Sequence, residues 1–182
     1  MKKAMFFDLQ GTLGGEFLGD IRDFEFYPFA MEALKLAKAN DYLVFIITNQ
    51  SRIAKGYYTL EEYKKHKLRL LDLMKSQDII VDGFYCCPHD KNQCTCKKPQ
   101  DGMIKMALEK HEIDISNSYV IGDLGLSDMN LSKTIGSKSL LVLTGGGRSS
   151  LDEYKHLWPH VNPTIIADNV LVGIKKIIGE LK

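Results

Sequence analysis

Short apolar runs alternate with amphipathic segments along most of the 182-residue chain. Six runs have the length and composition of β-strands, namely Lys3–Phe7, Leu43–Ile47, Gly83–Cys86, Ser118–Ile121, Ser139–Leu143 and Thr164–Ala167. Five segments between or after them have helical spacing, namely Phe29–Ala39, Thr59–Ser76, Met103–His111, Asp128–Thr134 and Val170–Leu181. Strands that alternate with helices predict an α/β fold, a parallel sheet with helices on both faces that binds ligands at the carboxyl ends of its strands.

The pattern continues from end to end without an internal repeat, a linker or a low-complexity tract. The hydrophobic content of 45% is enough for a substantial core. We therefore expect a single domain over residues 1–182, with no large inserted cap domain.

Charge and hydropathy narrow the possible partners. The chain has 24 Lys and Arg against 23 Asp and Glu, a net charge of +1, which gives no broad field for nucleic acid or an anionic membrane. No apolar run approaches the length of a membrane span, and the apolar stretch before Asp8 is too short for a signal peptide. We expect a cytoplasmic protein that acts on a small molecule, and the sequence is silent on oligomeric state.

Polar side chains follow three of the predicted strands. Asp8 follows the first strand, Thr48 and Asn49 follow the second, and Asp123 follows the fourth. Because the carboxyl ends of parallel strands meet at one edge of a sheet, we expect these groups to share one crevice. A carboxylate at such a position can be a nucleophile, a metal ligand or a helix cap.

Nearby residues favour phosphoryl chemistry. Asp123 and Asp128 would add hard oxygen ligands suited to Mg²⁺. Thr48 offers a hydroxyl and Lys98 a positive charge, both of which can hold a phosphate. Asp128 could equally cap the helix that follows it.

Four segments carry a resemblance to a known family: FFDLQGTLGG, ITNQSRIAKGYYT, YCCPHDKNQCTCKKPQDGM and IGDLGLSDM. In this order they resemble the haloacid dehalogenase (HAD) superfamily of phosphohydrolases. More narrowly, they resemble the branch that includes the heptose 1,7-bisphosphate phosphatases and the histidinol-phosphate phosphatase domains. The resemblance covers most of the chain and ends near Gly145.

This resemblance implies a Rossmann-like fold and a role for each matching residue. Asp8 would be the nucleophile, and Thr48 and Lys98 would bind the phosphate. Apart from the resemblance, Asn49 and Arg52 are further candidates for contact with the substrate. Mg²⁺ would be held by Asp8, the main-chain carbonyl of Gln10 and Asp123, with Asp128 beside the metal. The substrate would be a small phosphorylated metabolite, such as a sugar phosphate, a sugar bisphosphate or histidinol phosphate.

Gln10 departs from the pattern of the family. Most phosphatases of this superfamily have at that position a second aspartate, which protonates the leaving oxygen and then activates the attacking water. An amide can do neither, and general acid–base catalysis contributes about 10²- to 10⁴-fold. Slow hydrolysis, another acid that takes over the role, and phosphate binding without chemistry therefore all remain open.

All four cysteines lie in a short loop, at about residues 86–98. Cys87, His89, Cys94 and Cys96 are soft ligands at a spacing that suits a closed, structural Zn²⁺ site, and the resembled branch has such a zinc loop. Cys86 lies outside this set and is expected to be a small buried residue. A nucleic-acid knuckle is the alternative, and the near-neutral charge disfavours it.

Two further segments remain ambiguous. Arg52 and Lys55 would face a second anionic group of the substrate or lie in a solvated loop. The glycines of Gly145–Arg148 resemble a phosphate cradle, but they lack the context of a strand, GxGxxG and a helix, which favours a flexible surface loop.

Overall fold

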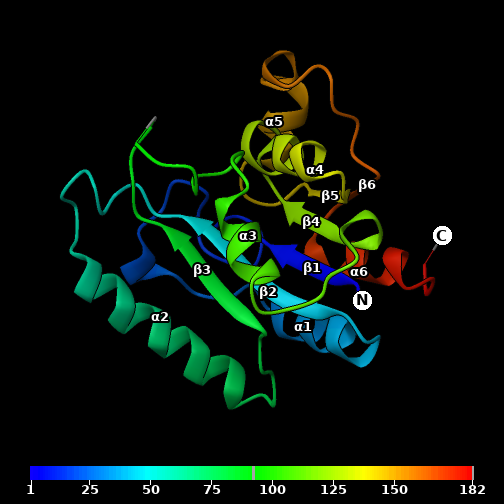
Figure 1. Ribbon diagram of the computed structural model, residues 1–182, viewed down its shortest axis with the longest axis horizontal. Coiled ribbons are helices and arrows are strands. Elements are labelled where there is room, and N and C mark those ends of the chain that lie inside the picture. Colours follow the sequence, from blue (N-terminus) through cyan, green and yellow to red (C-terminus); the bar gives the residue numbers. More distant parts are fainter. Residues whose placement is uncertain (92, 182) are drawn as a thin grey trace.

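The computed structural model describes residues 1–91 and 93–181. Its centre is a six-stranded sheet with the strand order β3-β2-β1-β4-β5-β6, and all neighbouring strands are parallel (Figure 1). The strands are β1 (Ala4–Phe7), β2 (Leu43–Asn49), β3 (Gly83–Cys87), β4 (Tyr119–Gly122), β5 (Lys138–Val142) and β6 (Ile165–Ala167). The predicted parallel sheet is therefore confirmed.

Helices cover both faces of this sheet. They are α1 (Ala30–Ala39), α2 (Leu60–Lys75), α3 (Gly102–Leu108), α4 (Asn130–Ile135), α5 (Gly147–Asp152) and α6 (Val170–Ile177). Apolar side chains of α1, α2 and α6 share one core cluster, whereas those of α3 and α4 share a second cluster on the opposite face. Single helical turns occur at Ile21–Asp23, Ile115–Asn117, Gly125–Met129 and Lys155–Leu157. None of the helices in the described residues is long and apolar enough to cross a membrane.

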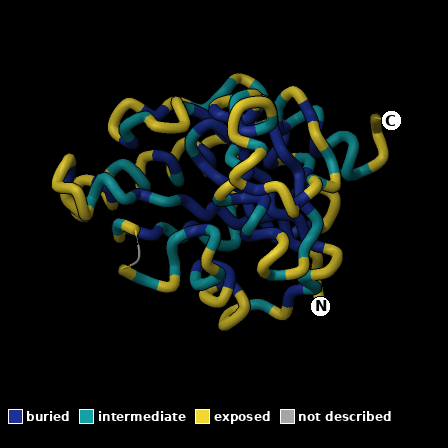
Figure 2. Tube along the Cα trace, turned by 90° about the horizontal axis from the view of Figure 1, so that it is seen from above, coloured by how far each residue is buried: buried dark blue, intermediate teal, exposed yellow. Residues whose placement is uncertain are grey.

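The central strand shows why its sequence is apolar throughout. Met5 and Phe7 belong to the cluster under α1, and Ala4 and Phe6 belong to the cluster under α3. Successive side chains of a strand point to opposite faces, so a strand covered on both sides needs apolar residues at every position. Figure 2 shows these buried strands in the middle of the molecule, with the exposed segments around them.

Several predicted boundaries were wrong by a turn or less. β2 continues through Thr48 and Asn49, because the adjoining β3 pairs with both residues. The helix predicted to reach His111 ends at Leu108, where the polar stretch EKHE begins. The helix predicted to reach Leu181 ends at Ile177, and Gly179 has a left-handed φ of 82° shortly after it.

The strand order fixes the position of the site. The chain winds outward from β1 in one direction to β2 and β3, and then returns to the other side of β1 with β4. Ligands of open parallel sheets bind where the winding reverses, at the carboxyl ends of the two strands concerned. Asp8 follows β1 and Asp123 follows β4, so both carboxylates lie at this point.

Candidate active site

A buried lysine joins two aspartates at the ends of the central strands. The main-chain N–H of Asp8 donates to the carbonyl oxygen of Ile121 (2.8 Å), which continues the pairing of β1 with β4 by one residue. The Nζ of Lys98 lies 2.6 Å from Oδ1 of Asp8 and 2.8 Å from Oδ1 of Asp128. All three side chains are buried, so the ion pairs are shielded from water.

The charges of this cluster do not balance. Burial raises the pKa of Asp8 to about 6, although the Lys98 ammonium opposes the shift and the Asp128 carboxylate adds to it. Burial and the Asp8 carboxylate also raise the pKa of Asp123 well above its ordinary value. Burial lowers the pKa of Lys98, but the carboxylates of Asp128 and Asp8 outweigh it and keep the pKa above its usual range.

Three carboxylates with one ammonium suit a divalent cation. Oxygen atoms of Asp8, Asp123 and Asp128 all lie within 4.8 Å of one another. Mg²⁺ prefers such hard oxygen ligands, and its charge would favour the ionised forms of Asp8 and Asp123, whose pKa values burial and neighbouring carboxylates raise. The donor set therefore fits the predicted metal.

Asp123 is held by main-chain geometry. Its Oδ2 accepts a hydrogen bond from the N–H of Gly146 (2.7 Å), and its Oδ1 lies 3.4 Å from the hydroxyl of Thr12, which donates to it. A Cβ on Gly11 would lie 2.2 Å from Oδ2 of Asp123, and one on Gly145 would lie 2.4 Å from it. Only glycine leaves room for the carboxylate at these two positions, and both have a left-handed φ.

The segment Gly145–Arg148 is thus part of the site, and the expected flexible surface loop was wrong. Gly146 and Gly147 are buried, and Gly147 begins α5. A Cβ on Gly147 would lie 1.8 Å from the carbonyl oxygen of Val142. The glycines are needed because the chain turns sharply from β5 into α5 against Asp123, and this packing has no signature in the sequence.

A chain of polar side chains connects Thr48 to Gln10. Nε2 of Gln50 donates to the hydroxyl oxygen of Thr48 (2.8 Å) and to Oε1 of Gln10 (2.9 Å). The hydroxyl of Tyr58 donates to Oε1 of Gln50 (2.6 Å), and Nε2 of Gln10 donates to the carbonyl oxygen of Gly19 (2.7 Å). Both ends of the Gln10 amide are therefore engaged, and the amide connects the end of β2 with the turn at Gly19.

Asn49 holds the backbone of the buried lysine. Its Oδ1 accepts from the N–H of Lys98 (3.0 Å), and its Nδ2 donates to the carbonyl oxygen of Lys98 (3.2 Å). The sequence suggests that Asn49 contacts the substrate, and this stays a prediction. In the structure its amide fixes the position of Lys98, since two hydrogen bonds to one residue restrict both translation and rotation.

Arg52 lies at the rim of the site. One of its nitrogens donates to the carbonyl oxygen of Leu18 (2.5 Å), and another lies 4.0 Å from Oδ2 of Asp20. Its guanidinium stacks 5.0 Å from the centre of the Tyr57 ring. Lys55 lies nearby with its Nζ 3.9 Å from a carboxylate oxygen of Asp90. Both cations remain partly exposed and can still meet an anion.

A cavity of about 430 Å³ opens above these groups. Its floor includes Asp8, Thr48 and Lys98, and its rim includes Arg52 and Lys55. The volume is within the range of small-molecule sites, about 300 to 1,000 Å³. The structure thus brings the predicted phosphate-binding residues together at the base of one pocket.

Comparisons with known proteins agree with this geometry. A protein-family profile described as HAD-hydrolase-like matches residues 95–172. The chain is 34% identical to a D-glycero-β-D-manno-heptose-1,7-bisphosphate 7-phosphatase of Haemophilus ducreyi, over 85% of this chain and 90% of that protein. It is 39% identical to a D-glycero-α-D-manno-heptose-1,7-bisphosphate 7-phosphatase of Campylobacter jejuni, over 76% of this chain and 82% of that protein. The chain belongs to the HAD-like hydrolases.

The fold of this HAD-like hydrolase matches a solved structure over nearly its whole length. A D,D-heptose 1,7-bisphosphate phosphatase from B. bronchiseptica, complexed with magnesium and phosphate, superimposes with a TM-score of 0.85 at 22% identity. The match covers 98% of this chain and 99% of that one. The predicted Rossmann-like fold of the HAD superfamily is confirmed.

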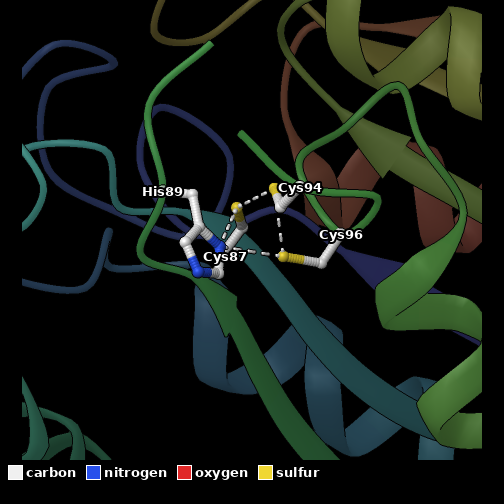
Figure 3. Close-up of side chains that lie close together, drawn as sticks. All are labelled: Cys87, His89, Cys94 and Cys96. Carbon is white, nitrogen blue, oxygen red and sulfur yellow. Dashed lines mark hydrogen bonds between the residues drawn. The ribbon is translucent and has the colours of Figure 1, made fainter. Parts of the chain in front are cut away.

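The four predicted zinc ligands of the HAD-like hydrolase lie close together beside β3 (Figure 3). Sγ of Cys87 lies 3.4 Å from Sγ of Cys94, which lies 3.4 Å from Sγ of Cys96. Nδ1 of His89 lies 3.4 Å from the sulfur of Cys96 and 3.7 Å from that of Cys87. Zn–S bonds of about 2.3 Å place the corners of a tetrahedron about 3.8 Å apart, so the four ligands fit Zn²⁺.

Sequence reasoning missed the residues that position the site. Gln50 and Tyr58 do not contact Asp8, yet they hold the Thr48 hydroxyl and the Gln10 amide. The motif TNQ contains Gln50, so its place beside Thr48 was a usable signal. Tyr58 offered none, because its hydroxyl reaches Gln50 only through the turn that follows β2.

Proposed function

We propose that this HAD-like hydrolase is a Mg²⁺-dependent phosphatase that cleaves a small phosphorylated metabolite through an aspartyl-phosphate on Asp8. The observation that supports it most is the Lys98 ammonium, which bridges Asp8 and Asp128 at the base of the cavity. An ammonium at this point holds the nucleophilic carboxylate and balances the charge on a transferring phosphoryl group. The close relatives named as phosphatases support the same reaction.

In the first step, a carboxylate oxygen of Asp8 attacks the phosphorus and the bond from phosphorus to the leaving oxygen breaks. Lys98 and the hydroxyl of Thr48 hold the phosphoryl oxygens. The leaving oxygen needs a proton, and the Gln10 amide has none to give, so the proton comes from water. Poor leaving groups are therefore cleaved slowly.

In the second step, water attacks the phosphorus of the aspartyl-phosphate, which releases inorganic phosphate and frees the Asp8 carboxylate. A carboxylate at position 10 would accept the proton of this water. The amide cannot, because its oxygen is a weak base that already accepts from Gln50. The intermediate is expected to hydrolyse slowly.

The Mg²⁺ would be held by Asp8, Asp123 and the main-chain carbonyl of Gln10, with Asp128 beside it. A bound Mg²⁺ would supply positive charge that stabilises the phosphoryl oxygens in the transition state. The main-chain carbonyl at position 10 is the same for glutamine as for aspartate. Glutamine at this position therefore affects proton transfer and spares metal binding. The Cys87, His89, Cys94 and Cys96 group would hold a structural Zn²⁺ that orders the loop leading to Lys98.

The substrate class follows from the rim of the cavity. Arg52, Lys55 and Lys97 place positive charge on its outer side, where a second phosphate of a sugar bisphosphate would lie. Heptose bisphosphates are the substrates named for the relatives, and they fit this arrangement. A phosphate-binding protein without turnover is the second possibility, and the fully engaged Gln10 amide favours it.

Phosphate release from a panel of sugar phosphates and bisphosphates, with and without Mg²⁺, tests the proposal. We expect Mg²⁺-dependent release that the substitution Asp8→Asn abolishes, because an amide is a poor nucleophile. Calorimetric titration with phosphate serves as the second readout. Phosphate binding without release above background from any substrate would support the binding protein and refute the phosphatase.

A further inference from the structure

A second cavity, of about 540 Å³, adjoins the candidate active site. The two cavities share six lining residues, namely Phe17, Asn49, Lys97, Lys98, Leu124 and Ser127, so they meet beside Lys98, the partner of Asp8. From that point, one branch extends toward the cations at the rim. The other branch, called the apolar groove here, extends between Phe17, Leu126, Tyr154, Leu157 and Trp158.

The walls of the apolar groove expose large side chains to solvent. Leu126 and Tyr154 are each 49% exposed, Leu157 is 47% exposed and Phe17 is 40% exposed. They come from three parts of the chain, because Tyr154 and Leu157 belong to one segment, and together they line one hollow. Contiguous apolar surface of this kind is uncommon on soluble proteins outside binding sites.

The floor of the groove is the buried indole of Trp158, held by a hydrogen bond and a cation–π contact. Trp158 is only 1% exposed, and its Nε1 donates to the carbonyl oxygen of Ser150 (3.0 Å). The ammonium of Lys155 lies 3.7 Å from the centre of its ring, which gives a favourable cation–π contact. A Cβ on Gly125 would lie 1.9 Å from the ring, so the glycine lets the indole pack onto the backbone just after Asp123.

The proposed reaction uses only the polar branch of this divided site. A fully hydroxylated sugar bisphosphate pairs its second phosphate with Arg52 and Lys55, and it has no apolar part to fill a groove of this size. The groove nevertheless begins at Lys98, whose ammonium lies 2.6 Å from the Asp8 carboxylate. A group bound in it can therefore be covalently joined to a phosphate that lies at Asp8.

We propose that the apolar groove binds the organic part of the substrate, and that the protein accepts phosphate monoesters of alkyl or aryl alcohols in addition to sugar phosphates. This inference rests on the proposed function, since it places the phosphate at Asp8 and Lys98. Its physical basis is the transfer of apolar surface from water to the walls formed by Leu126, Tyr154 and Leu157, which favours binding in proportion to the area buried.

Alkylphosphonates test the groove without catalysis, because their carbon–phosphorus bond is not hydrolysed by this reaction. Calorimetric titration of the Mg²⁺-loaded protein with hexylphosphonate and with ethylphosphonate compares two ligands with the same head group. We expect hexylphosphonate to bind at least tenfold more tightly. The double substitution Leu126→Ser and Leu157→Ser should reduce that preference to less than threefold.

Leu68→Ser is the matched control, because Leu68 is an exposed leucine of α2 that lies outside both cavities. It should retain the full preference for hexylphosphonate. Equal affinity for the two phosphonates in the unsubstituted protein, or a preference that survives the double substitution, overturns the groove even if sugar phosphates are hydrolysed. Binding of neither phosphonate overturns the groove and the proposed phosphate site together.

Discussion

Replacing Gln10 with aspartate tests the central chemical feature of the site. The substitution restores a carboxyl group at the position that lacks an acid, and it shortens the side chain by one methylene. It also removes the N–H that donates to the carbonyl oxygen of Gly19 (2.7 Å). The variant therefore gains a proton donor and acceptor but loses the contact that holds the turn at Gly19.

The two effects have different sizes. General acid–base catalysis contributes about 10²- to 10⁴-fold to the rate. The lost hydrogen bond costs about 1 kcal/mol, which lowers the equilibrium constant for forming the turn at Gly19 about fivefold. We therefore expect Gln10→Asp to raise steady-state turnover by between about twentyfold and two-thousandfold. The melting temperature should fall by about 2 to 4 °C, the shift that 1 kcal/mol produces in a chain of this size.

Rapid mixing with p-nitrophenyl phosphate and Mg²⁺ separates the two chemical steps. The p-nitrophenolate group leaves without needing a proton, so formation of the aspartyl-phosphate does not require an acid at position 10. The unsubstituted protein should release close to one equivalent of p-nitrophenol per chain in a burst and then turn over slowly. In Gln10→Asp the slow phase should accelerate and the burst should disappear.

Gln10→Ala is the control, because it loses the same contact with Gly19 and gains no acid. Its melting temperature should fall at least as much as that of Gln10→Asp, because it also loses the hydrogen bond from Gln50, and its steady-state rate should not rise. Equal steady-state rates in the aspartate and alanine variants would refute the reasoning, because a carboxyl group at position 10 would then have no role in proton transfer.

Three other predictions concern the groups around the site. Removing zinc by chelation, or the substitution Cys96→Ser, should lower the zinc content from about one per chain, which elemental analysis measures. The melting temperature should fall by about 10 °C, the effect of losing a ligand that is present at a thousand times its Kd. An unchanged melting temperature would contradict a structural role for the zinc. Asn49→Ala removes two hydrogen bonds to Lys98, so it should lower the free energy of unfolding by about 2 kcal/mol and also reduce turnover. Reduced turnover with an unchanged melting temperature would instead mean that Asn49 contacts the substrate. Gly125→Ala should displace the single Trp158 and shift its fluorescence to longer wavelength, at a cost of about 1 to 3 kcal/mol; Gly136→Ala, which has open space around it but a φ of 72°, should destabilise without changing the emission.

The sheet could be predicted because its signal is local. Runs such as Leu43–Ile47 are apolar at every position, and this occurs when a strand is buried on both faces. The carboxylates of Asp8 and Asp123 could be placed as well, since parallel strands carry the residues that follow them to one edge. Thr59 and Glu62 form a capping box at the start of α2, and their spacing of three residues is a local signal for the start of a helix.

The parts that could not be predicted depend on contacts between distant segments. Gly145 and Gly146 approach Asp123 only after β4 and β5 have paired, so in the sequence they read as an ordinary loop. Trp158 gave no functional signal either, because its position beside Gly125 depends on packing between segments more than 30 residues apart. Such residues carry no periodicity of their own.

The charges and hydrogen bonds around Gln10 explain why this site can hold an amide where the resembled family has a carboxylate. An aspartate here would carry a negative charge near Asp8, whose pKa is already raised by burial and by Asp128. The amide avoids that repulsion, and its two hydrogen bonds connect the turn at Gly19 with Gln50 and, through it, with Thr48. A single residue thus helps to hold the Thr48 hydroxyl and the turn at Gly19, and in the proposed reaction it would offer no group for proton transfer. Because the amide makes these hydrogen bonds without an ionisable group, the proposed phosphate site would keep its geometry while the hydrolytic step is slow.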